Sequence, residues 1–243
     1  MSNDIPLVVS FSKRGMFMRK ELEHFYIGEA LGGSQDWFMD PFMKLGGCGA
    51  VTACDTCIWL ARSQGAEWMY PFALQNLSRA EFLHFGRVMK PYLRPRSGGI
   101  NRLELYMRGF SSYLRGRAEA WRQEHPADCR NLSNIDDSAP RMLRMSGFAG
   151  TRSADEAWEA VIRQIDAGFP VPILVLRHKD PELKDFVWHW FLLIGYSDEE
   201  TEEKPARHIK AVTYGEWAWV DFDRLWDTGY EQKGGLVLYR WDE

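Results

Sequence analysis

Residues 46–57 read Gly46-Gly47-Cys48-Gly49-Ala50-Val51-Thr52-Ala53-Cys54-Asp55-Thr56-Cys57. The run of small and apolar residues predicts a helix from Gly49 to about Arg62, apolar nearly all round and therefore buried. Glycines beside Cys48 permit a tight turn and a close approach, and free N–H groups at a helix N-terminus stabilise a thiolate. Cys48 is thus a candidate nucleophile, and the alternative is a structural cysteine buried where loop and helix pack.

The composition is that of an ordinary globular protein. Of 243 residues, 45% are hydrophobic and 26% are charged, which suits one large domain or two small ones and is enough for a real core. A net charge of −4 gives no general attraction to nucleic acid or to an anionic membrane. No apolar run approaches the roughly 20 residues of a membrane span, and the N-terminus lacks the basic region of a secretory signal. We therefore expect a cytoplasmic protein with reduced thiols and neither membrane nor nucleic-acid partners.

The first two thirds of the chain predict mainly helices. Expected segments are, in chain order, a strand at 5–11, a segment of mixed helical character at 18–31, an extended loop at 32–41 and irregular structure at 125–152. Ser78 and Glu81 match a capping box, which opens a helix that stops before Pro91. A longer amphipathic helix is expected to begin at Asn101.

The last third predicts one helix followed by short strands. Ser153 and Glu156 match a second capping box, and Gly168 marks the end of that helix. Strands are expected at 170–176, 186–195, 208–213, 217–222 and 236–241, with an acidic turn at 198–203. Short strands at this spacing indicate an antiparallel sheet or half-barrel. The chain is therefore predicted to be α+β, with chemistry in a cleft between a helical lobe and a sheet lobe.

His189 is the candidate base for a thiol nucleophile, which needs a proton acceptor within hydrogen-bond reach. It falls within an apolar strand, where alternation places it on the same face as Phe191 and Leu193. A core histidine bonded to a backbone carbonyl is the alternative. A cysteine early in the chain and a histidine about 140 residues later is the order used by papain-like enzymes.

Three segments carry a further likeness. They are Gly47–Ala53, Asp166-Ala167-Gly168-Phe169-Pro170-Val171-Pro172-Ile173-Leu174-Val175 and His189-Trp190-Phe191-Leu192-Leu193-Ile194-Gly195-Tyr196. Together they resemble the C39-like cysteine peptidases, a papain-like family, over about a third of the chain. The resemblance implies a papain-like fold, with the cysteine-bearing helix packed on an antiparallel sheet or half-barrel. Residues 1–243 would form a single domain, and residues 66–150 a mostly helical insertion or lobe of it.

The resemblance also implies roles for individual residues. Cys48 corresponds to the nucleophile and His189 to the general base and acid. The family has a glutamine upstream of the cysteine that donates to the oxyanion, and Gln35 takes that place, 13 residues from Cys48 and farther than usual. Asp40 is nearer in sequence, but a carboxylate would repel an oxyanion.

The strand after the histidine departs from the family pattern. The family has Asp or Asn there to orient the imidazole, whereas Val212 stands where Asn would fall and Thr213 is the candidate acceptor. Two hypotheses follow. The first is a cysteine peptidase, amide hydrolase or acyl-transferase, acting without a cofactor on a peptide, small amide or thioester through an acyl-enzyme. The second is a catalytically degenerate binding module on the same fold.

Two other motifs are more typical of structure than of chemistry. Cys54 and Cys57 form a Cys-x-x-Cys, yet they lie roughly 240° and 180° around the predicted helix from Cys48. Redox motifs of this kind occupy helix N-termini, and no second pair completes a zinc site, so we expect both residues to be buried and no metal to be bound. Residues 87–122 hold eight Arg and one Lys against two Glu. Their spacing favours the solvated face of an amphipathic helix over a nucleic-acid site.

Overall fold

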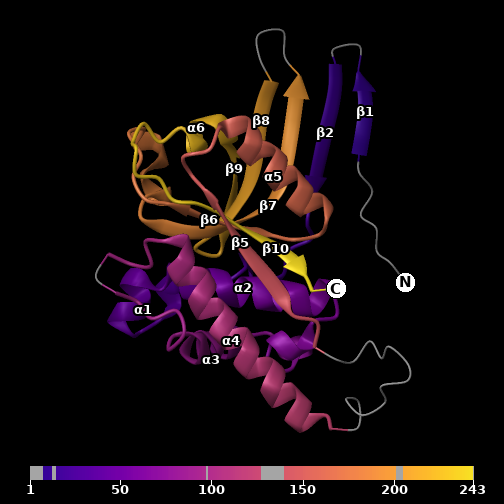
Figure 1. Ribbon diagram of the computed structural model, residues 1–243, viewed down its shortest axis with the longest axis vertical. Coiled ribbons are helices and arrows are strands. Elements are labelled where there is room, and N and C mark those ends of the chain that lie inside the picture. Colours follow the sequence, from indigo (N-terminus) through magenta and orange to yellow (C-terminus); the bar gives the residue numbers. More distant parts are fainter. Residues whose placement is uncertain (1–7, 13–14, 97, 127–139, 201–204, 243) are drawn as a thin grey trace.

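The computed structural model describes residues 8–12, 15–96, 98–126, 140–200 and 205–242 (Figure 1). Over these residues the fold is α+β, an antiparallel sheet with several helices, as predicted. The buried hydrophobic side chains of helices and strands form one cluster. Helices α1–α4 gather below the strands in Figure 1, whereas α5 and α6 lie higher.

The helices in this part of the chain vary widely in length. They are α1 (Pro41–Gly46), α2 (Cys48–Ser63), α3 (Arg79–Met89), α4 (Leu103–Glu124), α5 (Ala154–Asp166) and α6 (Phe222–Trp226), with 3-10 turns η1 (Gln35–Trp37), η2 (Glu67–Met69), η3 (Leu74–Asn76) and η4 (Pro181–Phe186). No helix among the described residues combines the length and apolarity that crossing a bilayer requires.

The strands pair antiparallel throughout. They are β1 (Val8–Ser12), β2 (Gly15–Glu21), β3 (Tyr26–Ile27), β4 (Ala30–Leu31), β5 (Leu143–Ala149), β6 (Val171–Val175), β7 (His189–Glu200), β8 (Pro205–Thr213), β9 (Glu216–Asp221) and β10 (Gly235–Trp241). The main sheet has the order β1-β2-β7-β6-β10-β5, and β8 joins β7 to β9. The small pair β3-β4 stands apart.

Strand β7 is the centre of the sheet. Its first half pairs with β6, its second half pairs with β2, and β8 pairs along it from Leu192 onward. Because β7 and β8 are antiparallel, the start of β7 lies beside the end of β8. This pairing brings His189, the first residue of β7, next to Thr213, the last residue of β8.

Helix α2 is the central helix of the core, and its predicted bounds are confirmed to within a residue. Every residue from Cys48 to Ala61 is buried. The helix contacts β7 on one side and α3 on another. The side chain of Trp190 on β7 lies against Gly49 at the start of α2, with Cδ1 3.5 Å from the position of a Gly49 Cβ, and it donates from Nε1 to the Ile100 carbonyl at 2.6 Å. The N-terminus of α2 is therefore placed against the start of β7.

Both predicted helix starts with capping patterns are confirmed. The Ser78 hydroxyl accepts from the backbone N–H of Glu81 at the start of α3. At the start of α5 the capping box is reciprocal, since Ser153 N–H donates to Glu156 and Glu156 N–H donates to Ser153. These bonds satisfy N–H groups that have no partner inside a helix.

Two predicted segments are wrong, and a third begins later than expected. Residues 18–31 contain no helix: they hold the end of β2, which pairs with both β1 and β7, and the short pair β3-β4 with the loops between. Part of 125–152 is strand β5, which pairs along its length with β10; residues 127–139 lie outside the described residues. The strand expected from Phe186 begins at His189, since η4 and a positive φ of 54° at Trp188 precede it.

Smaller differences concern strand ends. Strand β7 continues to Glu200, so the predicted acidic turn is partly strand; its residues 201–203 are not described. Phe222 begins α6 rather than ending a strand. The basic segment is confirmed as an amphipathic helix from Leu103 onward, because α4 buries Phe110 and Leu114 while Arg108 and Arg115 are exposed. Its earlier part, from residue 87 to residue 102, covers the end of α3 and the loop before α4.

Candidate active site

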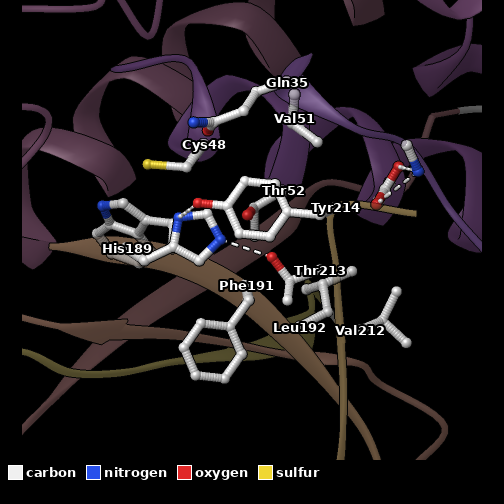
Figure 2. Close-up of a pocket in the computed structure, with 13 residues that line it drawn as sticks. Gln35, Cys48, Val51, Thr52, His189, Phe191, Leu192, Val212, Thr213 and Tyr214 are labelled. Carbon is white, nitrogen blue, oxygen red and sulfur yellow. Dashed lines mark hydrogen bonds between the residues drawn. The ribbon is translucent and has the colours of Figure 1, made fainter. Parts of the chain in front are cut away.

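A pocket lies between the N-terminal half of α2 and strands β7 and β8, where helices and sheet meet (Figure 2). All four candidate residues, Cys48, His189, Gln35 and Thr213, line it. The other lining residues are Gly33, Val51, Thr52, Asp55, Trp190, Phe191, Leu192, Val212 and Tyr214. Its free volume is about 10 Å³, which is room for roughly one water molecule.

Cys48 is the first residue of α2. Gly47 is the N-cap and offers no side-chain cap. A Cβ at Gly47 would lie 2.3 Å from the Met43 carbonyl oxygen, so only glycine permits α1 to pass this closely into α2. Because Cys48 is in the first turn, its own N–H has no partner within the helix. The thiol thus lies beside backbone donors, as the sequence predicted.

His189 is held by Thr213. Nε2 of the imidazole lies 2.5 Å from Oγ1 of Thr213. In Figure 2 the other ring nitrogen, Nδ1, is on the side nearer to Cys48. The ring of His189 also contacts Phe191, with centroids 6.0 Å apart. Thr213 therefore makes the contact expected of an orienting residue, although it comes from one position beyond Val212.

Val212 is excluded from that contact by the pleat of β8. It pairs with Leu192 and is buried. Side chains of successive strand residues point to opposite faces, so Val212 and Thr213 cannot both face the imidazole.

Gln35 lies beside Cys48 in Figure 2 although 13 residues separate them in sequence. Its Nε2 donates to the carbonyl of Lys44 in α1 at 3.0 Å. The amide nitrogen carries two hydrogens, so one N–H remains beyond this bond. The amide oxygen is buried and has no hydrogen-bond partner within the part of the chain that the structure describes.

Asp40 is not part of the pocket. Its carboxylate caps α1 by accepting from the N–H groups of Phe42 and Met43, and it forms an ion pair with Lys90. The hydrogen bond from Lys90 holds the pKa of Asp40 below its usual value. Its role is structural, in agreement with the repulsion argument.

Burial leaves the Cys48–His189 pair uncharged. It raises the pKa of the Cys48 thiol, against the effect of backbone N–H groups of Trp190, Gly49 and Cys48 itself. Burial also lowers the pKa of His189 to about 4. At neutral pH the two groups are thus a thiol and a neutral imidazole. Within the described chain no hydrogen bond joins Sγ of Cys48 to His189.

Tyr214 is a pocket residue that sequence reasoning missed. Its ring stacks on the His189 imidazole, with centroids 4.6 Å apart and planes 2° from parallel, and its hydroxyl lies 3.4 Å from Nδ1. Tyr214 and Gly215 form the two-residue turn between β8 and β9, with φ of 55° and 78°. Such turns favour Asn-Gly. An aromatic residue where the turn favours Asn was the signal in the sequence that could have identified Tyr214 as a pocket residue.

Cys54 and Cys57 lie away from the pocket, fully buried in the core as predicted. Across the described ranges, no group of three or more His, Cys, Asp or Glu side chains is arranged to hold a metal ion.

Comparisons with protein-family models, with curated proteins and with solved structures find no match to this chain.

Proposed function

We propose that the protein is a cysteine hydrolase or acyl-transferase of papain-like fold, with Cys48 as nucleophile and His189 as general base and acid. The observation that carries the proposal is the 2.5 Å contact between His189 Nε2 and Thr213 Oγ1. If Nε2–H donates to this oxygen, the lone pair of the imidazole is on Nδ1, the nitrogen nearer to Cys48. In that tautomer the hydrogen bond to Thr213 orients the imidazole, and Nδ1 is the atom that takes the proton from Cys48.

In the first step, Sγ of Cys48 attacks the substrate carbonyl carbon and its proton passes to Nδ1 of His189. The carbonyl π electrons move to oxygen, and the backbone N–H of Cys48 and the second N–H of Gln35 are the donors to that oxyanion. When the intermediate collapses, the bond to the leaving amine or thiol breaks. The proton on Nδ1 passes to that leaving group, and an acyl-enzyme remains.

In the second step, water or an acceptor amine attacks the acyl-enzyme. His189 accepts a proton from this nucleophile through Nδ1, the C–S bond breaks, and the proton returns to Cys48 as its thiol. Peptides, small amides and thioesters all fit this sequence of bond changes, so the proposal concerns the reaction class and not one substrate.

The uncharged resting pair defines how the thiol is activated. A preformed thiolate–imidazolium pair would need a raised imidazole pKa and a lowered thiol pKa, whereas the directions in this pocket are opposite. Proton transfer therefore accompanies attack, as in general-base catalysis. Because the pocket has free space of only about 10 Å³, a substrate also requires the Tyr214 ring to move off the imidazole.

Reaction with p-nitrophenyl acetate tests this proposal. Wild-type protein is expected to release a burst of p-nitrophenol equal to the protein concentration, and Cys48→Ala to release none. Cys57→Ala is the matched control, since it removes a buried thiol from the same helix outside the pocket. A burst of equal size in Cys48→Ala would contradict the proposal.

A non-catalytic binding module remains the second candidate. It is favoured by the stacked Tyr214 ring and by a neutral orienting hydroxyl in place of a carboxylate. This candidate predicts that wild type and Cys48→Ala behave alike towards the ester. It also predicts that His189→Ala leaves the rate of Cys48 modification unchanged.

A further inference from the structure

Asp55 is a buried acid that the proposed mechanism does not use. It lies seven residues after Cys48 on α2, which is about two helical turns, and so on the same face of the helix. Both residues line the pocket. The Asp55 carboxyl group accepts the backbone N–H of Gly33, at 3.0 Å to Oδ1 and 3.2 Å to Oδ2. It thereby joins the cysteine-bearing helix to the loop that leads to Gln35.

The backbone of that loop has little freedom. A Cβ at Gly33 would lie 1.9 Å from the Phe82 ring, and a Cβ at Gly32 would lie 2.8 Å from Oδ2 of Asp55. Gly32 also has a φ of 74°. The two glycines let the chain pass between the α3 ring and the α2 carboxyl group, at a distance that permits the hydrogen bond.

Gln35 is therefore fixed at both ends. Two residues before it, Gly33 is bonded to Asp55, and at its far end the side-chain amide is bonded to the Lys44 carbonyl. Asp55 and Cys48 belong to one rigid helix. The hydrogen bond from Gly33 to Asp55 thus sets the position of the Gln35 backbone relative to Sγ of Cys48. A shift of about 1 Å in the Gln35 amide would be costly to catalysis.

We propose that Asp55 is a positioning residue, which holds the oxyanion donor Gln35 over Cys48 through its bond to Gly33. The proposal rests on the proposed function, because it gives Gln35 a part in acyl transfer. Asp55 touches neither the nucleophile nor the base among the contacts of the described residues.

The surroundings of Asp55 determine which substitution preserves its role. His24 faces it across Gly32, with Nε2 3.1 Å from the position of a Gly32 Cβ, and neither His24 ring nitrogen has a hydrogen-bond partner among the described residues. Lys210 and Arg62 are the charged groups that act on His24. Burial raises the pKa of Asp55 to about 8 and lowers that of His24 to about 3. At neutral pH Asp55 is a neutral acid, and Asn reproduces its one acceptor and one donor side.

Two reactions of the same thiol separate positioning from general structural damage. Iodoacetamide alkylates Cys48 by displacement at a saturated carbon and forms no oxyanion, whereas p-nitrophenyl acetate acylates it through one. In Asp55→Ala we expect acylation to fall at least about tenfold while alkylation stays within about twofold of wild type. Asp55→Asn is expected to retain most of the acylation rate. Gln35→Ala, which removes the donor, should cost about a hundredfold in acylation.

Coupling provides the decisive result. If Asp55 acts through Gln35, the double variant Asp55→Ala/Gln35→Ala acylates no more slowly than Gln35→Ala alone. Independent, multiplying losses would overturn the proposal, and so would an equal fall in alkylation and acylation. Cys57→Ala controls for removal of a buried side chain from α2. If Asp55→Ala does not melt cooperatively, Asp55→Ser provides the same comparison, because its hydroxyl is too short to reach Gly33.

The two proposals fail differently. If wild-type protein shows no acylation beyond that of Cys48→Ala, the proposed function is wrong. If wild type acylates and Asp55→Ala acylates equally fast, only the positioning role of Asp55 is wrong.

Discussion

Helix α2 carries cysteines in its first turn and in its second and third turns, and their surroundings differ. Cys48 in the first turn lines the pocket, with backbone N–H groups of Trp190 and Gly49 beside its sulfur. Cys54 and Cys57 lie deeper, fully buried among apolar side chains. Burial raises the pKa of all three thiols, and that of Cys54 and Cys57 well above the usual value.

The difference shows that position along and around the helix decides what a cysteine can do. Residues six and nine positions after Cys48 point about 240° and 180° away from it. They therefore face the core, and neither is among the residues that line the pocket with His189. Only the first turn offers unpaired backbone donors.

The largest expected effect is the difference in acylation rate between the Cys48→Ala and Cys57→Ala variants. Cys48→Ala should abolish acylation by p-nitrophenyl acetate, because the nucleophile is gone. Cys57→Ala should leave the acylation rate unchanged and cost about 1 kcal/mol of unfolding free energy through a small cavity. Burst kinetics and thermal melts measure the two effects. Loss of the burst in Cys57→Ala would contradict the assignment of Cys48, rather than a buried cysteine of α2, as the nucleophile.

Removing the base is expected to have the next largest effect. His189→Gln should lower the acylation rate between about 100-fold and 10,000-fold, the range for loss of a general base. Stopped-flow measurement of p-nitrophenol release gives this rate. The thermal midpoint serves as the control, and an unchanged rate in a folded variant would exclude His189 as the proton acceptor.

A smaller effect is expected at the orienting residue. Thr213→Val keeps the shape of the side chain but removes Oγ1, the partner of His189 Nε2. We expect acylation to slow about tenfold, because the tautomer with Nδ1 as acceptor is no longer selected. Thr213→Ser restores the oxygen and should recover most of the rate. Equal rates in the Val and Ser variants would show that the bond does not orient the imidazole.

The pH dependence of the unfolding free energy tests whether Asp55, in the buried part of α2, has a raised pKa. Asp55 has its folded pKa raised to about 8, so below pH 8 the folded protein holds a proton that the unfolded chain has released. Stability therefore rises as pH falls from about 8 towards 4. Asp55→Asn lacks this contribution. The difference in unfolding free energy, wild type minus variant, should grow by about 1.4 kcal/mol per pH unit as pH falls below 8.

Urea titrations of both proteins at several pH values measure this difference. A pH-independent difference would show that Asp55 has an ordinary pKa. Taking the difference cancels His24 and His189, whose lowered pKa values act in the opposite direction below about pH 6.5.

The smallest expected effect concerns the cover of the pocket. Tyr214→Asn removes the ring that stacks on His189 and introduces the residue that its turn favours. We expect the second-order rate of Cys48 alkylation by iodoacetamide to rise several-fold with no loss of thermal stability. A slower alkylation would indicate that Tyr214 supports the pair rather than covering it.

Local patterns predicted the helix that carries Cys48 and the C-terminal strands well. Capping boxes and small apolar runs depend on neighbours in sequence, and α2 and α5 follow them closely. Strand β5 was missed because its partner β10 lies about 90 residues away, and its own sequence alternates weakly. Strand β2 was missed for the same reason, since β7 supplies one of its edges.

The candidate site was predicted in its main members but not in how they meet. Gln35 meets Cys48 across 13 residues of sequence because α1 stands between them and turns back towards η1. Asp55 gave no signal, since an acid inside an apolar helix is informative only once Gly33 is seen to bond to it. Tyr214 reaches His189 only through the turn geometry between β8 and β9.

The most direct test is to locate the acyl group. After reaction of the wild-type protein with p-nitrophenyl acetate and an acid quench, peptide mass mapping is expected to find one acetyl group, on Cys48 as a thioester. Cys54 and Cys57 should be unmodified, and the thioester should be absent from His189→Gln after the same reaction time. Acetyl groups spread over several thiols, or on lysines alone, would contradict Cys48 as the nucleophile of an acyl-enzyme.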